Sequence, residues 1–124
     1  MKIIKRNYRI FVKDILDSIK AIEHFVGKLG YNQFIKDDKT VSAVIRKLEI
    51  IGEAAKNIPP FVKEKSAEID WKSMAGMRDK LIHDYFGVDT EILWVVVKKD
   101  VPHIKPLIKQ LLEDVKKKGK GINA

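Results

Sequence analysis

A chain of 124 residues has the length of one ordinary domain, which can bury a hydrophobic core without disulfides or structural metal ions. It contains no cysteine, which excludes a disulfide framework and thiolate metal sites and fits a reducing compartment. Lysine and arginine total 25 against 17 for aspartate and glutamate, and the formal charge of +8 favours polyanionic partners such as RNA, DNA or anionic lipid surfaces.

The N-terminal part of the chain predicts one long amphipathic helix followed by a linker. Apolar residues recur at three- and four-residue steps over residues 7–29, and Gly30 follows as a stop signal. Residues 31–39 are predicted to be a linker that ends in Asp37 and Asp38, two side chains of the kind that cap helices. A second helix is therefore expected to begin directly after them.

This second helix is predicted over residues 40–57, and it ends before the consecutive prolines at 59 and 60. Besides its main apolar stripe it carries a second apolar patch on the far side, formed by Ala43, Ile50 and Ala54. A helix that is apolar on two faces is either central in its domain or shared with another chain. Between the two faces runs a polar stripe that could line a cleft, formed by Arg46, Glu49, Glu53 and Asn57.

The middle of the chain predicts shorter elements. Residues 61–69 are expected to form a short helix or an irregular packing segment. Asp70 is then the predicted N-cap of a helix that ends at Gly87, with Gly76 inside it as a residue that disfavours a regular helix. A further helix is predicted to begin at Asp89 or the threonine after it.

The C-terminal part of the chain predicts a last amphipathic helix that Pro102 opens or kinks. Residues 116–124 are expected to be a basic, frayed tail. Residues 1–124 are therefore predicted to form a single all-α domain, an up-and-down bundle of four or five helices. No signal-peptide run and no stretch of about 20 apolar residues is present, so a cytoplasmic protein without a membrane partner is expected.

Common cofactor and metal motifs are missing from the sequence. The three histidines share neither HxxxH nor HExxH spacing, and no carboxylate cluster resembles a calcium loop or a two-metal site. No phosphate-binding GxGxxG or GxxxxGK[ST] loop is present. Neither a metal nor another cofactor is therefore expected.

An arginine within the predicted helix over residues 70–87 is the most informative residue of the chain. At about 100° per residue, Arg78 falls on one face with apolar residues, namely Trp71, Met74, Leu81, Ile82 and Tyr85. A desolvated guanidinium needs an anion or a place at an edge or interface. His83 lies five residues further on, about 140° around the helix, and Asp79 precedes it by four residues, within side-chain reach.

Two interpretations of these residues are open. In the structural one, Arg78 pairs with a carboxylate such as Glu53 across the bundle, and His83 is a surface histidine held by Asp79. In the functional one, they cleave a phosphodiester without metal, because histidine can transfer protons near neutral pH and arginine binds phosphate oxygens bidentately. One chain supplies one such histidine, and a two-fold dimer would place two histidines and two arginines around one cleft.

The motif and its surroundings resemble a known family. Arg78-x4-His83-x-Tyr85 lies within GMRDKLIHDYFGVD and follows LEIIGEAAKNIP at residues 48–59. Together these strings resemble the HepT-like branch of the HEPN superfamily of small helical toxins, and the resemblance covers nearly the whole chain.

The resemblance implies a homodimeric, metal-independent endoribonuclease, the toxin of a type VII toxin-antitoxin system. By carry-over, Arg78 would bind the scissile phosphate of RNA, His83 would act as general acid or base, and Asp79 could orient His83, with Glu53 in support. The family's antitoxin is a minimal nucleotidyltransferase (MNT) that transfers AMP to the motif tyrosine, here Tyr85. The added negative charge would occupy the anion site and repel RNA.

A rival class of function is a non-catalytic binding module. In that class the same bundle is a dimeric subunit that docks a nucleotidyltransferase, and Arg78 only anchors a phosphate group. No base-reading module is recognisable in the sequence, so it does not indicate which RNA would be bound or cut.

Overall fold

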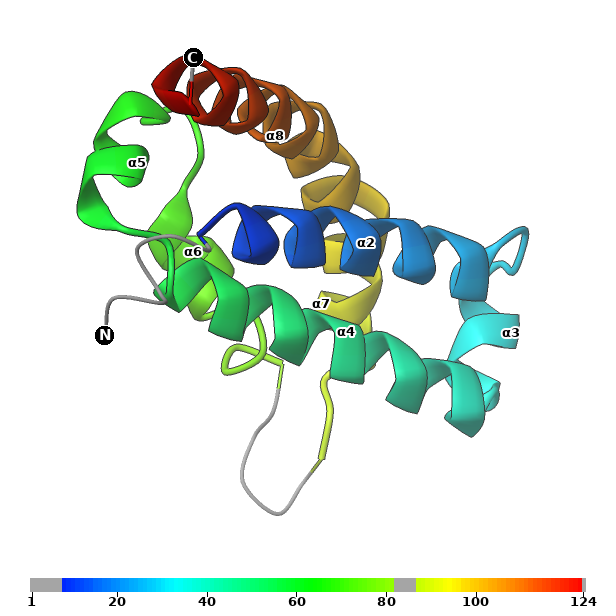
Figure 1. Ribbon diagram of the computed structural model, residues 1–124. Coiled ribbons are helices and arrows are strands. Elements are labelled where there is room, and N and C mark those ends of the chain that lie inside the picture. Colours follow the sequence, from blue (N-terminus) through cyan, green and yellow to red (C-terminus); the bar gives the residue numbers. More distant parts are fainter. Residues whose placement is uncertain (1–7, 82–86, 124) are drawn as a thin grey trace.

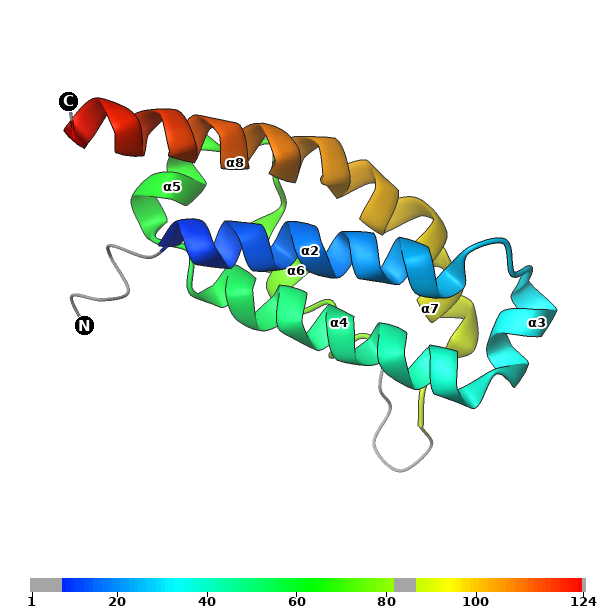
Figure 2. The same cartoon turned by 45° about the vertical axis from the view of Figure 1, so that its right-hand side comes forward.

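The computed structural model describes residues 8–81 and 87–123, and its regular elements within those ranges are helices. The predicted all-α class is confirmed. Three long helices lie side by side, namely α2 (Tyr8–Val26), α4 (Asp38–Lys56) and α8 (Val101–Asn123). Figures 1 and 2 show α2 between the other two and antiparallel to both. Helices α6 and α7 cover the back of this layer.

The first helix ends earlier than predicted. Gly27 adopts φ +51° directly after Val26, a left-handed conformation that glycine accepts without strain, and it ends α2 three residues before the predicted stop at Gly30. Gly30 instead precedes a short helix, α3 (Tyr31–Lys36), in the segment predicted to be a linker. The predicted cap of the next helix is confirmed, because the Asp37 carboxylate accepts a hydrogen bond from the Thr40 amide at 3.1 Å.

Helix α4 packs mainly against α2. Its core-facing stripe is buried, and it consists of Val41, Val44, Leu48, Ile51 and Ala55. In the predicted second patch, Ala54 is buried within this chain, whereas Ala43 and Ile50 are half-buried. Pro59 then precedes a short helix, α5 (Pro60–Lys65), which carries the chain from the end of α4 toward α8 (Figure 1).

The predicted helix from residue 70 to Gly87 is wrong over residues 76–81, and its residues 82–86 lie outside the described residues. Asp70 is the N-cap, as predicted, but α6 (Trp71–Ala75) ends at Gly76, and residues 76–81 form turns. The Met77 amide bonds to the Met74 carbonyl at 3.2 Å, a three-residue step that tightens the chain instead of continuing the helix. Glycine inside a helix costs about 1 kcal/mol relative to alanine, so Gly76 favours an end at this point.

The Asp70 cap determines where α6 begins. Its carboxylate accepts hydrogen bonds from the Ser73 amide at 3.0 Å and the Ser73 hydroxyl at 2.8 Å. The bonds from the Ser73 amide and then its hydroxyl lower the pKa of the Asp70 carboxyl, because they favour its charged form.

The C-terminal third of the chain is nearly continuous helix. The predicted helix start at Asp89 or Thr90 is confirmed, since α7 (Thr90–Val95) follows Asp89 as its N-cap. A π-helical turn, η2 (Val96–Asp100), joins α7 to α8. Pro102 lacks the amide of a regular helical bond and its ring crowds the carbonyl four residues earlier, and the wider π-turn relieves that conflict. Residues 116–123, for which a frayed end is predicted, belong to α8.

The core fills the space between the long helices and α6 and α7. Its largest fully buried side chains include Ile15, Ile19, Phe34, Leu48, Met74, Leu81 and Leu93. Each such aliphatic or aromatic side chain contributes roughly 1.5–3 kcal/mol when removed from water. In the part of the chain that the structure describes, no helix has both the length and the apolar character needed to cross a membrane.

Candidate active site

A polar groove of about 180 Å³ lies between α4 and the turns that follow α6. It is lined by Arg46, Glu49, Gly52, Glu53, Lys56, Ala75, Arg78 and Asp79. The polar stripe of α4 therefore does line a cleft, as its spacing predicts, for three of its four members. The fourth, Asn57, is not among the lining residues, and its side-chain amide donates to the Glu53 carbonyl at 2.8 Å.

A close backbone approach at Gly52 positions the two walls of the groove. A β-carbon at this glycine would lie 3.1 Å from the Ala75 carbonyl oxygen, which is tighter than an ordinary contact. The bare backbone of α4 can thus pack directly on the last turn of α6. Arg78 follows Ala75 by three residues and Glu49 precedes Gly52 by three residues, so this contact brings the two charged side chains together.

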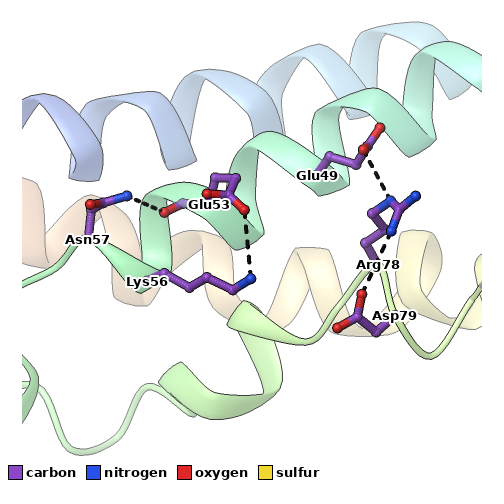
Figure 3. Close-up of polar contacts among 6 residues, drawn as sticks. All are labelled: Glu49, Glu53, Lys56, Asn57, Arg78 and Asp79. Carbon is purple, nitrogen blue, oxygen red and sulfur yellow. Dashed lines mark hydrogen bonds and ion pairs between the residues drawn. The ribbon is translucent and has the colours of Figure 1, made fainter.

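Arg78 is an exposed groove residue and not part of an apolar helical stripe. Its side chain is 46% exposed, and Nε lies 3.1 Å from Oε2 of Glu49 (Figure 3). Nη1 lies 3.8 Å from Oδ1 of the neighbouring Asp79. The predicted apolar face is wrong at this position because the helix ends before Arg78 is reached.

The carboxylate partner of Arg78 also differs from the one named from the sequence. Glu53 pairs with Lys56 at 3.6 Å, and Glu49, one turn earlier on α4, contacts Arg78 (Figure 3). Ion pairs exposed to this degree contribute only about 0–1 kcal/mol to folding. The Glu49–Arg78 pair therefore fixes the direction of a side chain more than it stabilises the fold.

The charges lining the groove are balanced and can still accept an anion. Three cations, Arg46, Lys56 and Arg78, face three carboxylates, those of Glu49, Glu53 and Asp79. Nε and Nη1 of Arg78 contact Glu49 and Asp79, whereas Nη2 forms no ion pair with a described residue and can donate to a phosphate oxygen. Among residues 8–81 and 87–123, no group of three histidine or carboxylate side chains is placed to hold a metal ion.

His83 and Tyr85, the other two residues of the predicted motif, lie outside the described residues. The backbone on either side of them is joined, because the Asp89 amide donates to the Leu81 carbonyl at 2.8 Å. Lys80 also contacts Asp100 of η2 at 3.4 Å. These two contacts join Leu81 to Asp89 and Lys80 to η2.

Comparison with known proteins relates the chain to ribonucleases. Residues 15–111 match the family described as "Ribonuclease HepT-like". The chain is 50% identical over 107 residues to "Probable ribonuclease HepT" of Thermococcus cleftensis, which covers 86% of this chain and 97% of that protein. It is 44% identical over 111 residues to "Putative RNase MJ0127" of Methanocaldococcus jannaschii, at 90% and 92% coverage. No solved structure matches the chain significantly.

Proposed function

Because the chain belongs to the HepT-like ribonuclease family, we propose that it is a metal-independent endoribonuclease and the toxin of a type VII toxin-antitoxin system. The observation that carries the proposal is the groove in which Glu49 contacts Nε of Arg78 while Nη2 forms no ion pair with a described residue and can bind an anion. His83 follows Arg78 by five residues in the sequence, in the spacing Arg-x4-His-x-Tyr.

The proposed reaction begins with attack of a ribose 2′-hydroxyl on the adjacent phosphorus. A histidine removes the hydroxyl proton, Arg78 neutralises the charge that develops on the phosphate oxygens, and a second proton donor protonates the departing 5′-oxygen. The products are a 2′,3′-cyclic phosphate and a 5′-hydroxyl. His83 fits both proton transfers if a two-fold dimer contributes one copy from each protomer to a shared cleft. Asp79 is proposed to orient His83, and Glu53 to support the groove.

Regulation is proposed to act through Tyr85. A minimal nucleotidyltransferase partner would catalyse attack of the phenol oxygen on the α-phosphorus of ATP, which forms a phosphodiester to AMP and releases pyrophosphate. The new phosphate carries a negative charge and lies seven residues from Arg78 in the sequence. It would compete with RNA for the guanidinium and repel the RNA backbone.

The test is cleavage of labelled RNA in EDTA by protein that mass spectrometry shows to be unmodified. Wild type should cut the RNA, and His83→Ala should lose at least a hundredfold in rate because it lacks the proton-transfer group. His24→Ala is the matched control, since His24 is exposed on α2 and does not line the groove. Equal cleavage by wild type and His83→Ala, or none by unmodified wild type, would refute the proposal.

One observation favours the second candidate, a non-catalytic subunit that docks a nucleotidyltransferase. Arg78 already faces the carboxylates of Glu49 and Asp79, which compete with a phosphate for it. Expression of the chain alone separates the two candidates. A toxin arrests growth and His83→Ala relieves the arrest, whereas a docking subunit has no such effect in either form.

A further inference from the structure

A second arginine lies in the same groove as Arg78. Arg46 belongs to α4 and precedes Glu49 by three residues, so the two side chains are neighbours on one face of the helix. Both line the groove together with Arg78. The carboxylate that contacts Arg78 is therefore flanked along α4 by a further guanidinium.

Arg46 differs from the other two cations of the groove because it has no carboxylate partner among the described residues. Arg78 contacts Glu49 and Asp79, and Lys56 contacts Glu53. Arg46 is exposed and forms no ion pair with any residue that the structure describes. The electrostatic potential of the groove should therefore be more positive near Arg46 than near Arg78 or Lys56.

We propose that Arg46 is a second phosphate-binding residue, which takes the phosphodiester next to the one that Arg78 binds. The inference rests on the proposed ribonuclease function and adds a subsite to it. Guanidinium binds a phosphodiester through two N–H donors, which suits an arginine better than a lysine at this position. Glu49 contacts Arg78 and forms no ion pair with Arg46, so the Arg46 guanidinium stays open to a phosphate.

The substitution that tests this subsite is Arg46→Gln, made in a His83→Ala background so that RNA is bound without being cut. Loss of one phosphate contact should weaken RNA binding about tenfold. For a single strand it should also reduce the slope of the logarithm of the binding constant against the logarithm of the salt concentration by about 0.7. Arg46→Lys should retain the salt dependence but not the full affinity. Arg9→Gln is the matched control, since Arg9 is an exposed arginine of α2 outside the groove.

A series of RNAs, each with one uncharged methylphosphonate linkage at a different position, locates the phosphate that Arg46 contacts. The parent protein should lose affinity when the linkage next to the cut site is neutral, and Arg46→Gln should be indifferent to that same change. Equal losses for the parent and Arg46→Gln at every linkage, or equal salt dependence for both, would overturn the subsite alone. Failure of unmodified wild type to bind and cut RNA would overturn the ribonuclease function, and the subsite with it.

Discussion

The Glu49 carboxylate can orient the Arg78 guanidinium for the proposed binding of a phosphate. Its carboxylate lies 3.1 Å from Nε of Arg78, on the inner edge of the guanidinium, and the side chain is 33% exposed. The long arginine side chain is costly to order, and an ion pair at Nε restricts it before RNA arrives. Glu49 would thus act as a positioning residue for Arg78 and not as a group that touches the substrate.

Replacement of this carboxylate should separate binding from catalysis. In Glu49→Gln the rate constant kcat should fall roughly tenfold or more, because Arg78 is less well oriented. KM should stay the same or decrease, since a negative charge has left the groove. Steady-state kinetics on one RNA measures both, with Glu64→Gln on α5 as the control at an exposed glutamate outside the groove. Wild-type kcat in Glu49→Gln would contradict the positioning role.

At the scale of the elements, the junction of α4 with α6 determines the site. The Gly52 backbone packs on the Ala75 carbonyl, Gly76 ends the helix, and the turns that follow present Arg78 to Glu49. The Gly52–Ala75 contact and the end of α6 together place Arg78 beside Glu49. A change that separates α4 from α6 by a few tenths of an ångström should therefore displace the Arg78 guanidinium.

Gly52→Ala is such a change. The added methyl group would lie 3.1 Å from the Ala75 carbonyl oxygen, so α6 must shift, while the helix propensity of α4 improves by up to about 1 kcal/mol. We expect a net change in unfolding free energy within about 1 kcal/mol but a several-fold loss of RNA cleavage. Urea denaturation and the cleavage rate, measured beside Gly30→Ala, test this. Unchanged cleavage would show that the junction tolerates the shift.

The cap of α6 should make stability depend on pH. The folded-state pKa of Asp70 lies below its unfolded value, so the stabilisation is fully present above about pH 4 and is lost as the pH falls through the folded pKa. Asp70→Asn keeps an acceptor for the Ser73 amide and should show less of this acid-dependent loss. Urea midpoints at pH 7 and pH 3 measure the difference. An equal loss in both proteins would show that Asp70 does not contribute to it.

The sequence predicts local features well and tertiary ones poorly. The caps at Asp37 and Asp70 follow from side chains that bond to nearby amides, and both are confirmed, as is the helix start at Asp89 or Thr90. The partner of Arg78 could not be chosen in this way, because Glu49 and Glu53 lie one turn apart on the same polar stripe. Only the packing of Gly52 on Ala75 selects Glu49.

The same limit explains why the predicted helix over residues 70–87 is wrong at residues 76–81. Apolar residues at helical spacing continue past Gly76, yet Met77 and Leu81 reach the core from turns. The spacing of apolar residues predicts which side chains are buried, but it does not by itself predict whether the backbone there is a helix or a turn. The family resemblance, which depends on the motif and its flanking strings, did not need the helix to be regular and is confirmed by the family match.

At the scale of the whole molecule, one protomer supplies a single motif histidine for two proton transfers. The proposed dimer resolves this shortage by symmetry, and it makes a specific prediction for mixed dimers. His83→Ala protein should be inactive alone. When it is refolded with wild type, the mixed dimers should also be inactive, because they hold one histidine for two proton transfers, so the rate should fall with the square of the wild-type fraction.

A rate of RNA cleavage that falls with the square of the wild-type fraction, with size-exclusion chromatography to confirm dimers, supports a cleft built from two protomers. Each protein refolded alone under the same conditions is the control. A rate that falls in direct proportion to the wild-type fraction would indicate that each protomer carries a complete site of its own.

The ends left on RNA cut in EDTA test the proposed chemistry most directly. Attack by the 2′-hydroxyl predicts a 2′,3′-cyclic phosphate on one fragment, a 5′-hydroxyl on the other, and no cleavage when the 2′-hydroxyl at the cut site is replaced by hydrogen. Fragments with 5′-phosphate ends, or cleavage of the 2′-deoxy substrate at the wild-type rate, would contradict catalysis by Arg78 and His83 through this route.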